Sequence, residues 1–408
     1  RSTAGAVLVL GSVLYPYVYL SCRSMFLMQG RQAADVARTL GASPLRVFFR
    51  VQLPMARPAI VIGLTLVMME TLNDIGAVEY LGVNTLTFAI YDTWLNRGSL
   101  AGAAQIAVVM LALVAALVLA ERHARRRQRF SSQKTTSMVH DAVRLKLAGW
   151  RGLLATIACA LPVLGGFGVP MIVLGGFAAR RLDQFVSAPL FAALGNTIVV
   201  AGATAVIAVL FSFLFSYSGR LGRGNVASLA VRLASFGYGV PGTVLAIGVL
   251  VPLAAIDNWV SGLMSQAFGL RTGLLLSGSI LAIVYAASVR FLTMAEGTLD
   301  AGFSKLSPHL DQAARTLGRT STQTLTSVLV PLMRPSVLTA GLLVFIETIK
   351  ELSATILLRP FNFNTLATLV YEDASRARVE DAAVPAMIII LAGLIPVILV
   401  SRSMEKAG

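Results

Sequence analysis

Charged residues are scarce in this sequence. They make up 13% of its 408 residues, about half of the share that is usual in a soluble globular domain. Hydrophobic residues make up 56%, which exceeds the roughly 45–50% of a soluble domain. The composition therefore excludes an ordinary soluble protein, and we expect most of the chain to lie in a membrane.

Cysteine and histidine are also rare. The two cysteines, Cys22 and Cys159, lie inside apolar segments and form neither a disulfide framework nor a metal-ligand spacing. His-Glu-x-x-His and Gly-x-Ser-x-Gly motifs are absent, and no glycine is followed by lysine, as a phosphate-binding loop would require. The sequence thus gives little support to a membrane-embedded enzyme, and it predicts no metal site and no cofactor of its own.

The net charge of +15 has two readings, a nucleic-acid partner or a membrane topology. Lysine and arginine of multi-span membrane proteins collect in cytoplasmic loops, and residues 122–146 form a strongly basic segment between apolar ones. We interpret this segment as a cytoplasmic linker and expect no nucleic-acid partner.

Several apolar stretches are long enough to cross about 30 Å of hydrocarbon as helices. We predict spans at residues 4–26, 58–80, 101–120, 149–177, 194–217, 236–256, 274–296, 336–358 and 382–401. With the linker in the cytoplasm, the spans alternate so that loops 81–100, 257–273 and 359–381 lie outside.

The chain contains an internal duplication. The word Ala-Arg-Thr-Leu-Gly occurs at residues 37–41 and again at residues 314–318. Further matches follow at the same offset, and the word Asn-Thr-Leu then recurs at 84–86 and 364–366. Such repeats are a frequent way to build transporters. We predict a first half at residues 1–121 and a second half at 147–408, and we expect the first half to lack about three N-terminal spans of a permease with about six spans in each half.

Each copy of the duplicated word lies in a long cytoplasmic loop, at residues 30–58 and 297–335. In the first copy we predict a short helix that ends at Gly41, and a second one capped by Ser43 with Pro44 in its first turn. The alternatives are a paired docking site for a partner and an amphipathic hairpin on the bilayer surface. Duplication at equivalent places favours the docking site.

The segments "DVARTLG…VQLP" and "QAARTLG…LVP" resemble the cytoplasmic EAA loop of ATP-binding-cassette importer permeases. The resemblance implies an all-α integral membrane protein with the type I importer permease fold, in the bacterial inner membrane. It also implies an ATPase dimer that binds ATP and magnesium, and a periplasmic solute-binding protein. The implied ATPase-coupling residues are Asp35, Val36, Ala37, Gly41, Leu53, Pro54, Gln312, Ala313, Ala314, Gly318, Val330 and Pro331. Asp35, Gln312, Val36 and Val330 depart from the family pattern.

The segments "METLNDIGAVEYLGVNTLT" and "FIETIKELSATILLRPFNFNTLATLVY" further resemble fused permeases for ferric iron. The resemblance implies import of ferric iron and leaves other solutes open, such as thiamine, a polyamine or an inorganic anion. A second alternative is an ion-coupled secondary transporter in which Glu70 and Glu347 carry protons. The paired cytoplasmic loops argue against it, because such a transporter docks no ATPase.

Ionisable residues lie in the two spans that follow the motif, although each costs about 2.5–3.5 kcal/mol at a bilayer centre. Glu70 and Asp74, like Glu347 and Glu351, are four residues apart, and we predict that each pair shares one helix face. The candidates for the translocation path are Glu70, Asn73, Asp74, Glu347, Lys350 and Glu351. The alternative is a structural network in which Lys350 pairs with Glu347 or with a carboxylate across the interface.

Overall fold

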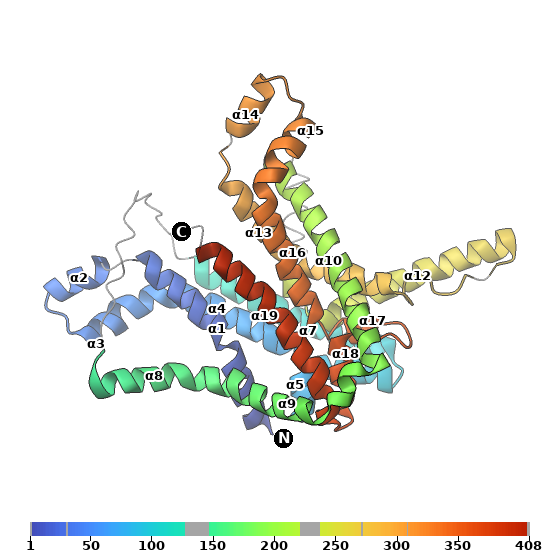
Figure 1. The fold of residues 1–408 in the computed structure, drawn as a ribbon, viewed down its shortest axis with the longest axis horizontal. Helices are drawn as coiled ribbons and strands as arrows, with labels where there is room; N and C mark the ends of the chain where they lie inside the picture. Colours follow the sequence, from blue (N-terminus) through green and yellow to red (C-terminus); the bar gives the residue numbers. More distant parts are fainter. Residues whose placement is uncertain are drawn as a thin grey trace. The chain divides into compact units, whose positions relative to one another are not determined.

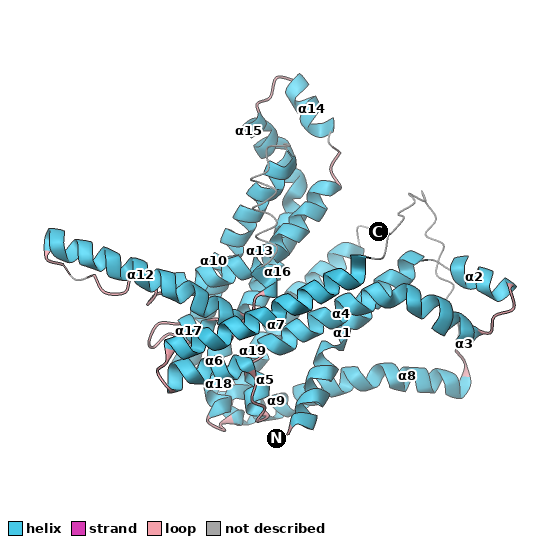
Figure 2. Cartoon of the chain, turned by 180° about the vertical axis from the view of Figure 1, so that it is seen from behind, coloured by secondary structure: helices cyan, strands magenta, loops and turns pink. Residues whose placement is uncertain are grey.

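The computed structural model describes residues 2–29, 32–126, 147–220, 237–270, 272–307 and 309–405. All regular structure in these ranges is helical (Figure 2). Most of the predicted linker 122–146 and the loop at 221–236 lie outside the described residues. The all-helical prediction is confirmed.

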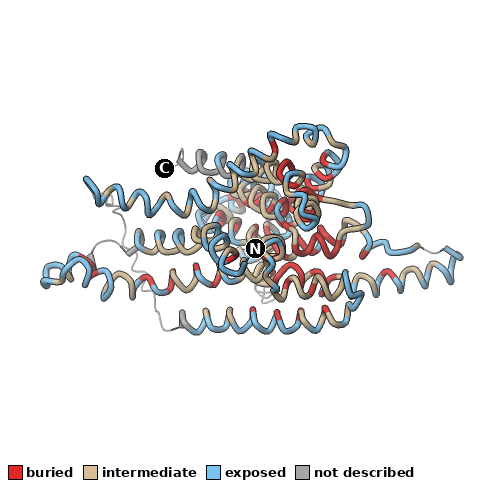
Figure 3. The backbone as a smooth tube through the Cα atoms, turned by 90° about the horizontal axis from the view of Figure 1, so that it is seen from below, coloured by how far each residue is buried: buried red, intermediate tan, exposed pale blue. Residues whose placement is uncertain are grey.

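Eight helices of the described part are long and apolar enough to cross a membrane. They coincide with the first eight predicted spans and run over Thr3–Phe26, Pro44–Asn73, Leu100–His123, Gly149–Arg180, Ala188–Arg220, Gly242–Phe268, Ile280–Ser304 and Thr322–Ile349. The last predicted span lies on α19 (Val379–Glu405). Buried positions recur at intervals along the helices, between intermediate and exposed ones (Figure 3). This is the pattern expected of helices whose outer faces meet lipid.

Two compact units make up the chain. Unit 1 contains residues 1–86 and 109–173, and unit 2 contains residues 87–108 and 174–408. Each unit therefore takes residues from both sides of the linker. The division into repeat halves at 1–121 and 147–408 is a division of the sequence, and it stays a prediction.

Unit 1 is built on the pairing of α1 (Thr3–Gln29) with α4 (Leu53–Asn73). At Gly63 the two backbones are so close that an added Cβ would lie 2.6 Å from the Cα of Val18. The helix α8 (Gly149–Val163) and the π-helical turn that follows it also contact α1. Small residues at such contacts let membrane helices approach closely.

Unit 2 is built on the mutual packing of α10 (Ala188–Arg220), α13 (Ile280–Ser304) and α16 (Val330–Ile349) (Figure 1). We call this group the three-helix core. Its buried side chains are Ala205, Ala208, Ala287, Phe291, Ala295, Leu299, Phe303, Leu329, Met333, Ala340 and Val344. A smaller apolar cluster joins α10 to α18 (Leu366–Ser375) and α19. Further helices of this unit include α6 (Leu86–Tyr91), α7 (Leu100–Arg126, shared with unit 1), α9 (Val169–Arg180, likewise shared) and α12 (Gly242–Phe268).

Two predicted spans end earlier than the sequence suggested. The prediction of a continuous span at 58–80 is wrong, because α4 ends at Asn73 and the short α5 (Gly76–Tyr80) follows it. The predicted span at 336–358 is likewise broken between α16 and α17 (Thr355–Leu358). Both breaks lie at the duplicated carboxylates, Asp74 and Glu351, and hydropathy does not report where a helix is interrupted.

The predicted outer loop 257–273 is also corrected, because α12 continues to Phe268. Asp257 is buried within this helix. Its Oδ1 accepts hydrogen bonds from the N–H groups of Leu275 (3.2 Å) and Leu276 (2.8 Å), and its Oδ2 accepts from Ser277 N–H at 2.8 Å and Ser277 Oγ at 2.7 Å. A carboxylate with this many donors can remain inside a helical hairpin.

The contact at Gly63 gives a testable prediction. Gly63→Ala should lower the melting temperature in detergent, because the new methyl group meets the α1 backbone and overpacking costs about 1–3 kcal/mol. Gly11→Ala on α1 is the matched control, since nothing lies within 4 Å of its Cβ position and alanine favours a helix over glycine. Equal melting temperatures for the two variants would contradict the close α1–α4 contact.

Candidate functional site

The two motif loops have the same construction. In the first, α2 (Gln32–Thr39) is followed by Gly41 and α3 (Pro44–Val47). In the second, α14 (His309–Thr316) is followed by Gly318 and α15 (Ser321–Thr324). Both glycines have φ of +80° and open space at the Cβ position. Glycine is therefore required for its left-handed backbone and not for room, and the predicted helix–bend–helix is confirmed.

Each loop is connected to the long helix that follows it by a wider helical turn. In the first copy, α3 continues through a π-helical turn, Phe48–Gln52, into α4. The second copy has the equivalent turn at Leu325–Leu329 before α16. Proline lacks the N–H that would continue the regular ladder, and a wider turn directly before Pro54 and Pro331 accommodates this loss.

The predicted cap at Ser43 is only partly correct. Ser43 occupies the cap position with Pro44 after it, but its side chain makes no capping hydrogen bond. The second copy is capped more fully. Gln323 N–H donates to Thr320 Oγ1 at 3.3 Å, and Thr320 N–H donates to Gln323 Oε1 at 3.0 Å. This reciprocal pair is a capping box, which fixes the direction in which the second loop leaves its bend.

The motif residues separate by exposure. Ala314 is buried, whereas Asp35, Val36, Gln312 and Ala313 are exposed on the short helices. Leu53, Pro54 and Ala37 are half-buried, and Val330 and Pro331 are exposed. Leu40 and Leu317, which directly precede the two glycine bends, are 83% and 82% exposed. Sequence reasoning missed these leucines, although both belong to the repeated word.

The prediction that each pair of carboxylates shares one helix face is wrong. Asp74 follows the end of α4 in an extended conformation, with ψ of 131°. Its Oδ1 accepts a hydrogen bond from the N–H of Val78 in α5 at 3.0 Å. Glu351 likewise follows the end of α16, and its carboxylate accepts from the N–H groups of Ala354 and Thr355 at 3.1–3.3 Å.

In both repeats, therefore, the second carboxylate caps the short helix that follows the break. The first N–H groups of a helix have no partner within it, and a negative charge there is favourable. We call the break around Lys350 and Glu351 the elbow. Carboxylates that satisfy helix ends explain how a membrane-spanning segment can be interrupted here.

The elbow carries a buried ion pair. Arg290 of α13 donates from Nη1 to Glu351 Oε1 at 2.5 Å, and the two side chains are only 7% and 4% exposed. Gly242, at the start of α12, packs against this pair, since a Cβ there would lie 2.7 Å from Arg290 Nη1 and 2.8 Å from Glu351 Oε1. Arg290 was missed from the sequence, although an arginine within the predicted span 274–296 is itself a signal of a partner.

The other charges at the elbow form a second pair. Lys350 Nζ lies 2.8 Å from Glu347 Oε1, and the lysine side chain is 48% exposed. Pairing of Lys350 with Glu347 is what we expected if these charges form a structural network. In unit 1, the equivalent Glu70, Asn73 and Asp74 are half-buried. The elbow thus combines a buried pair at Glu351 with a more accessible pair at Glu347.

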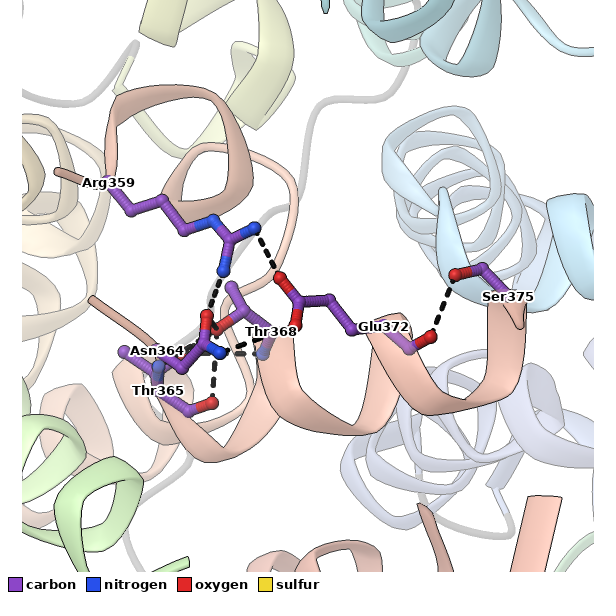
Figure 4. A network of polar contacts seen from close by, with 6 residues as sticks. All are labelled: Arg359, Asn364, Thr365, Thr368, Glu372 and Ser375. Atoms are coloured by element: carbon purple, nitrogen blue, oxygen red, sulfur yellow. Dashed lines mark hydrogen bonds and ion pairs between the residues drawn. The ribbon is translucent and has the colours of Figure 1, made fainter. Parts of the chain in front are cut away.

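A polar network follows the elbow (Figure 4). Arg359 donates to Asn364 Oδ1 and, at 2.5 Å, to Glu372 Oε1. Thr365 and Thr368 form a capping box at the start of α18. From α10, Asn196 Nδ2 donates to the Asn364 carbonyl at 2.9 Å, and Thr197 Oγ1 accepts from Leu366 N–H at 2.8 Å. The second Asn-Thr-Leu word is therefore fastened to both α18 and α10.

Equivalent residues of the two repeats meet within unit 2. Tyr91 and Tyr371 follow the Asn-Thr-Leu words by the same number of residues. Their ring centroids lie 5.8 Å apart at an interplanar angle of 78°, an edge-to-face arrangement that is favourable for aromatic rings. A residue that contacts its own repeat counterpart is the signature of a local pseudo-two-fold relation.

Comparison with known proteins shows what the chain is similar to. Residues 2–130 match the binding-protein-dependent transport system inner membrane component. The chain is 25% identical over 397 residues to the Fe(3+)-transport system permease protein FbpB 2 of Haemophilus influenzae, which covers 95% of this chain and 74% of the relative. It is 30% identical over 118 residues to the molybdenum transport system permease protein ModB of Escherichia coli K12, covering 28% of this chain and 52% of the relative.

Among solved structures, a chain of a bacterial alginate ABC transporter aligns with a TM-score of 0.49 and 15% identity, over 62% of this chain and 94% of that chain. The family match and the permease relatives agree with the eight apolar spans. The first third of the chain thus matches this family, most of the chain is similar to an ABC importer permease, and the chain is a multi-pass inner-membrane protein.

Proposed function

We propose that the chain forms the membrane path of an ATP-driven importer for ferric iron, which a periplasmic binding protein delivers. The likeness to the Haemophilus ferric-iron permease over 95% of the chain supports iron. The shorter likeness to a molybdenum permease, over 28% of the chain, makes an oxyanion the second candidate.

The observation that carries the proposal is the equal build of the two motif loops. Each loop bends at a left-handed glycine directly after an exposed leucine, Leu40 or Leu317. In the first loop Val36 and Leu45 are exposed as well, and exposed apolar side chains that gather on one loop are typical of an interaction site. Two such sites in one chain fit two subunits of a partner, and we assign them to an ATPase dimer that binds ATP and magnesium.

The exposure of the charged residues at the elbow indicates which of them line the translocation path. Glu351 is buried with all of its described contacts inside the protein, so we assign it a structural role together with Arg290. Glu347 and Lys350 are more accessible, and we assign them, with the equivalent Glu70, Asn73 and Asp74, to the wall of the path. A carboxylate already paired with an ammonium group holds a cation less strongly than a free one, which suits a path that has to release its solute.

The solute is tested by transport in proteoliposomes that contain the intact permease, its ATPase and its binding protein. We expect ATP-dependent uptake of ferric iron loaded on the binding protein, and at least about tenfold less uptake of molybdate. Preferential uptake of molybdate would contradict the iron assignment and favour the second candidate. Uptake that a proton gradient drives without ATP would contradict the importer itself.

The bends give a prediction about docking. Gly41→Val with Gly318→Val should abolish co-purification of the ATPase, because a β-branched residue is strongly disfavoured at φ of +80°. Gly269→Val is the matched control, since Gly269 ends α12 with φ of +71° and open space at its Cβ position. Normal ATPase binding by the double variant would show that the loops are not docking sites.

The elbow gives a prediction about stability. Glu351→Gln should lower the folded yield, because it leaves Arg290 buried without a carboxylate, at a cost of about 3–5 kcal/mol. Adding Arg290→Met should restore the yield, whereas Lys350→Met should not. Glu347→Gln, at the accessible pair, should change stability by less than about 1 kcal/mol and reduce uptake. Yield is measured by size-exclusion chromatography in detergent. A normal yield for Glu351→Gln would overturn the structural role.

A further inference from the structure

We propose that Arg220 is a positioning residue that fastens the second motif loop to the three-helix core, so that displacement of α14 is transmitted to α10 and α13. The inference rests on the proposed docking of an ATPase at this loop. Its geometric basis is independent of the solute.

Arg220 is the last residue of α10, and its guanidinium joins several segments at once. Nε lies 2.7 Å from Asp311 Oδ2, in the first turn of α14. Nη1 donates to the carbonyls of Phe303 and Leu306 at 3.1 Å each, and Nη2 donates to the carbonyl of Ser307 at 2.8 Å. One side chain thus connects α10, the end of α13, the turn after it and the start of α14.

These contacts require an arginine. The last carbonyls of α13 have no partner within their helix and carry partial negative charge. A planar guanidinium with five N–H donors can serve such carbonyls and a carboxylate together, whereas a lysine ammonium cannot span them. The side chains of Arg220 and Asp311 are 12% and 21% exposed, so this pair is shielded more than a surface ion pair, which contributes little.

The contacts of Arg220 with Asp311, Phe303, Leu306 and Ser307, which we call the clamp, are connected to the three-helix core. Phe303, whose carbonyl accepts from Arg220, is buried with Leu299 and Met333 in the apolar cluster of α10, α13 and α16. Arg290, which holds the elbow, lies on the same α13 helix, roughly 20 Å away at 1.5 Å per residue. A movement of α14 therefore acts on the helix that carries the elbow's arginine.

A comparison of the two repeats shows that the first motif loop lacks the carboxylate of this clamp. Aligning the two Ala-Arg-Thr-Leu-Gly words places Ala34 opposite Asp311. Alanine has no carboxylate to offer, so the first loop cannot form the same ion pair. The two loops, alike in their bends and exposed leucines, differ in how they are held.

The first test needs neither ATPase nor solute. Hydrogen exchange is measured on the intact permease in detergent for wild type, Arg220→Gln and Asp311→Asn. We expect exchange of the amides in residues 303–311 to rise about tenfold in Arg220→Gln, and to rise less in Asp311→Asn, which keeps the carbonyl contacts. Unchanged exchange in Arg220→Gln would overturn the clamp. Asp311→Asn keeps the test decisive if Arg220→Gln does not fold.

The second test measures coupling in proteoliposomes, as ferric iron imported per ATP hydrolysed. We expect Arg220→Gln and Arg220→Lys to keep ATPase binding but to lower this ratio at least about tenfold. Arg151→Gln, on α8 and outside the clamp, is the matched control. A wild-type ratio in both Arg220 variants would overturn the positioning role. A wild-type permease that binds no ATPase would contradict the proposed function instead, and the exchange result would still decide the clamp.

Discussion

A carboxylate inside a membrane protein has to be paired or hydrogen-bonded, and Glu351 shows how much of the structure follows from this requirement. Its oxygens accept from Arg290 and from the first N–H groups of α17. These contacts end α16, begin α17 and bind α13 to the break. They also leave no room for a side chain at Gly242, so that α12 starts directly against the ion pair. The free-energy cost of burying the Glu351 carboxylate is offset because it accepts hydrogen bonds from N–H groups that would otherwise have no partner at the start of a helix.

A similar arrangement, with the charges reversed, occurs where the three-helix core meets the second motif loop. There a cation, Arg220, satisfies the carbonyls at the end of α13 and the carboxylate of Asp311. Between the two sites, α13 is packed through alanines and large apolar residues against α10 and α16. Close-packed helices move as a unit more easily than they deform. The helix α13 therefore has one polar anchor near its middle, at Arg290, and another at its C-terminal end, and we infer that it links the motif loop to the elbow.

Much of this architecture could be predicted from the sequence, and the failures have a common cause. Apolar runs predicted the spans, and the repeated glycines predicted the bends, because both signals are local. The helix breaks at Asp74 and Glu351 were missed, since a spacing of four residues indicates a shared helix face only if the helix continues. Arg290 and Arg220 were not recognised because their partners, Glu351 and Asp311, are distant in sequence. The meeting of Tyr91 with Tyr371 likewise depends on tertiary packing.

The proposed importer requires that both motif loops contact an ATPase. The most direct measurement is site-specific cross-linking from single cysteines at Leu40 and Leu317, which are exposed to nearly the same extent, in a chain whose Cys22 and Cys159 are replaced by serine. A cysteine at Leu8, which is also exposed but lies on α1, serves as the control. We predict that cysteines at positions 40 and 317 each cross-link to an ATPase subunit and that a cysteine at position 8 cross-links to none. Failure of both motif positions to cross-link, in a complex that hydrolyses ATP, would contradict the proposed importer.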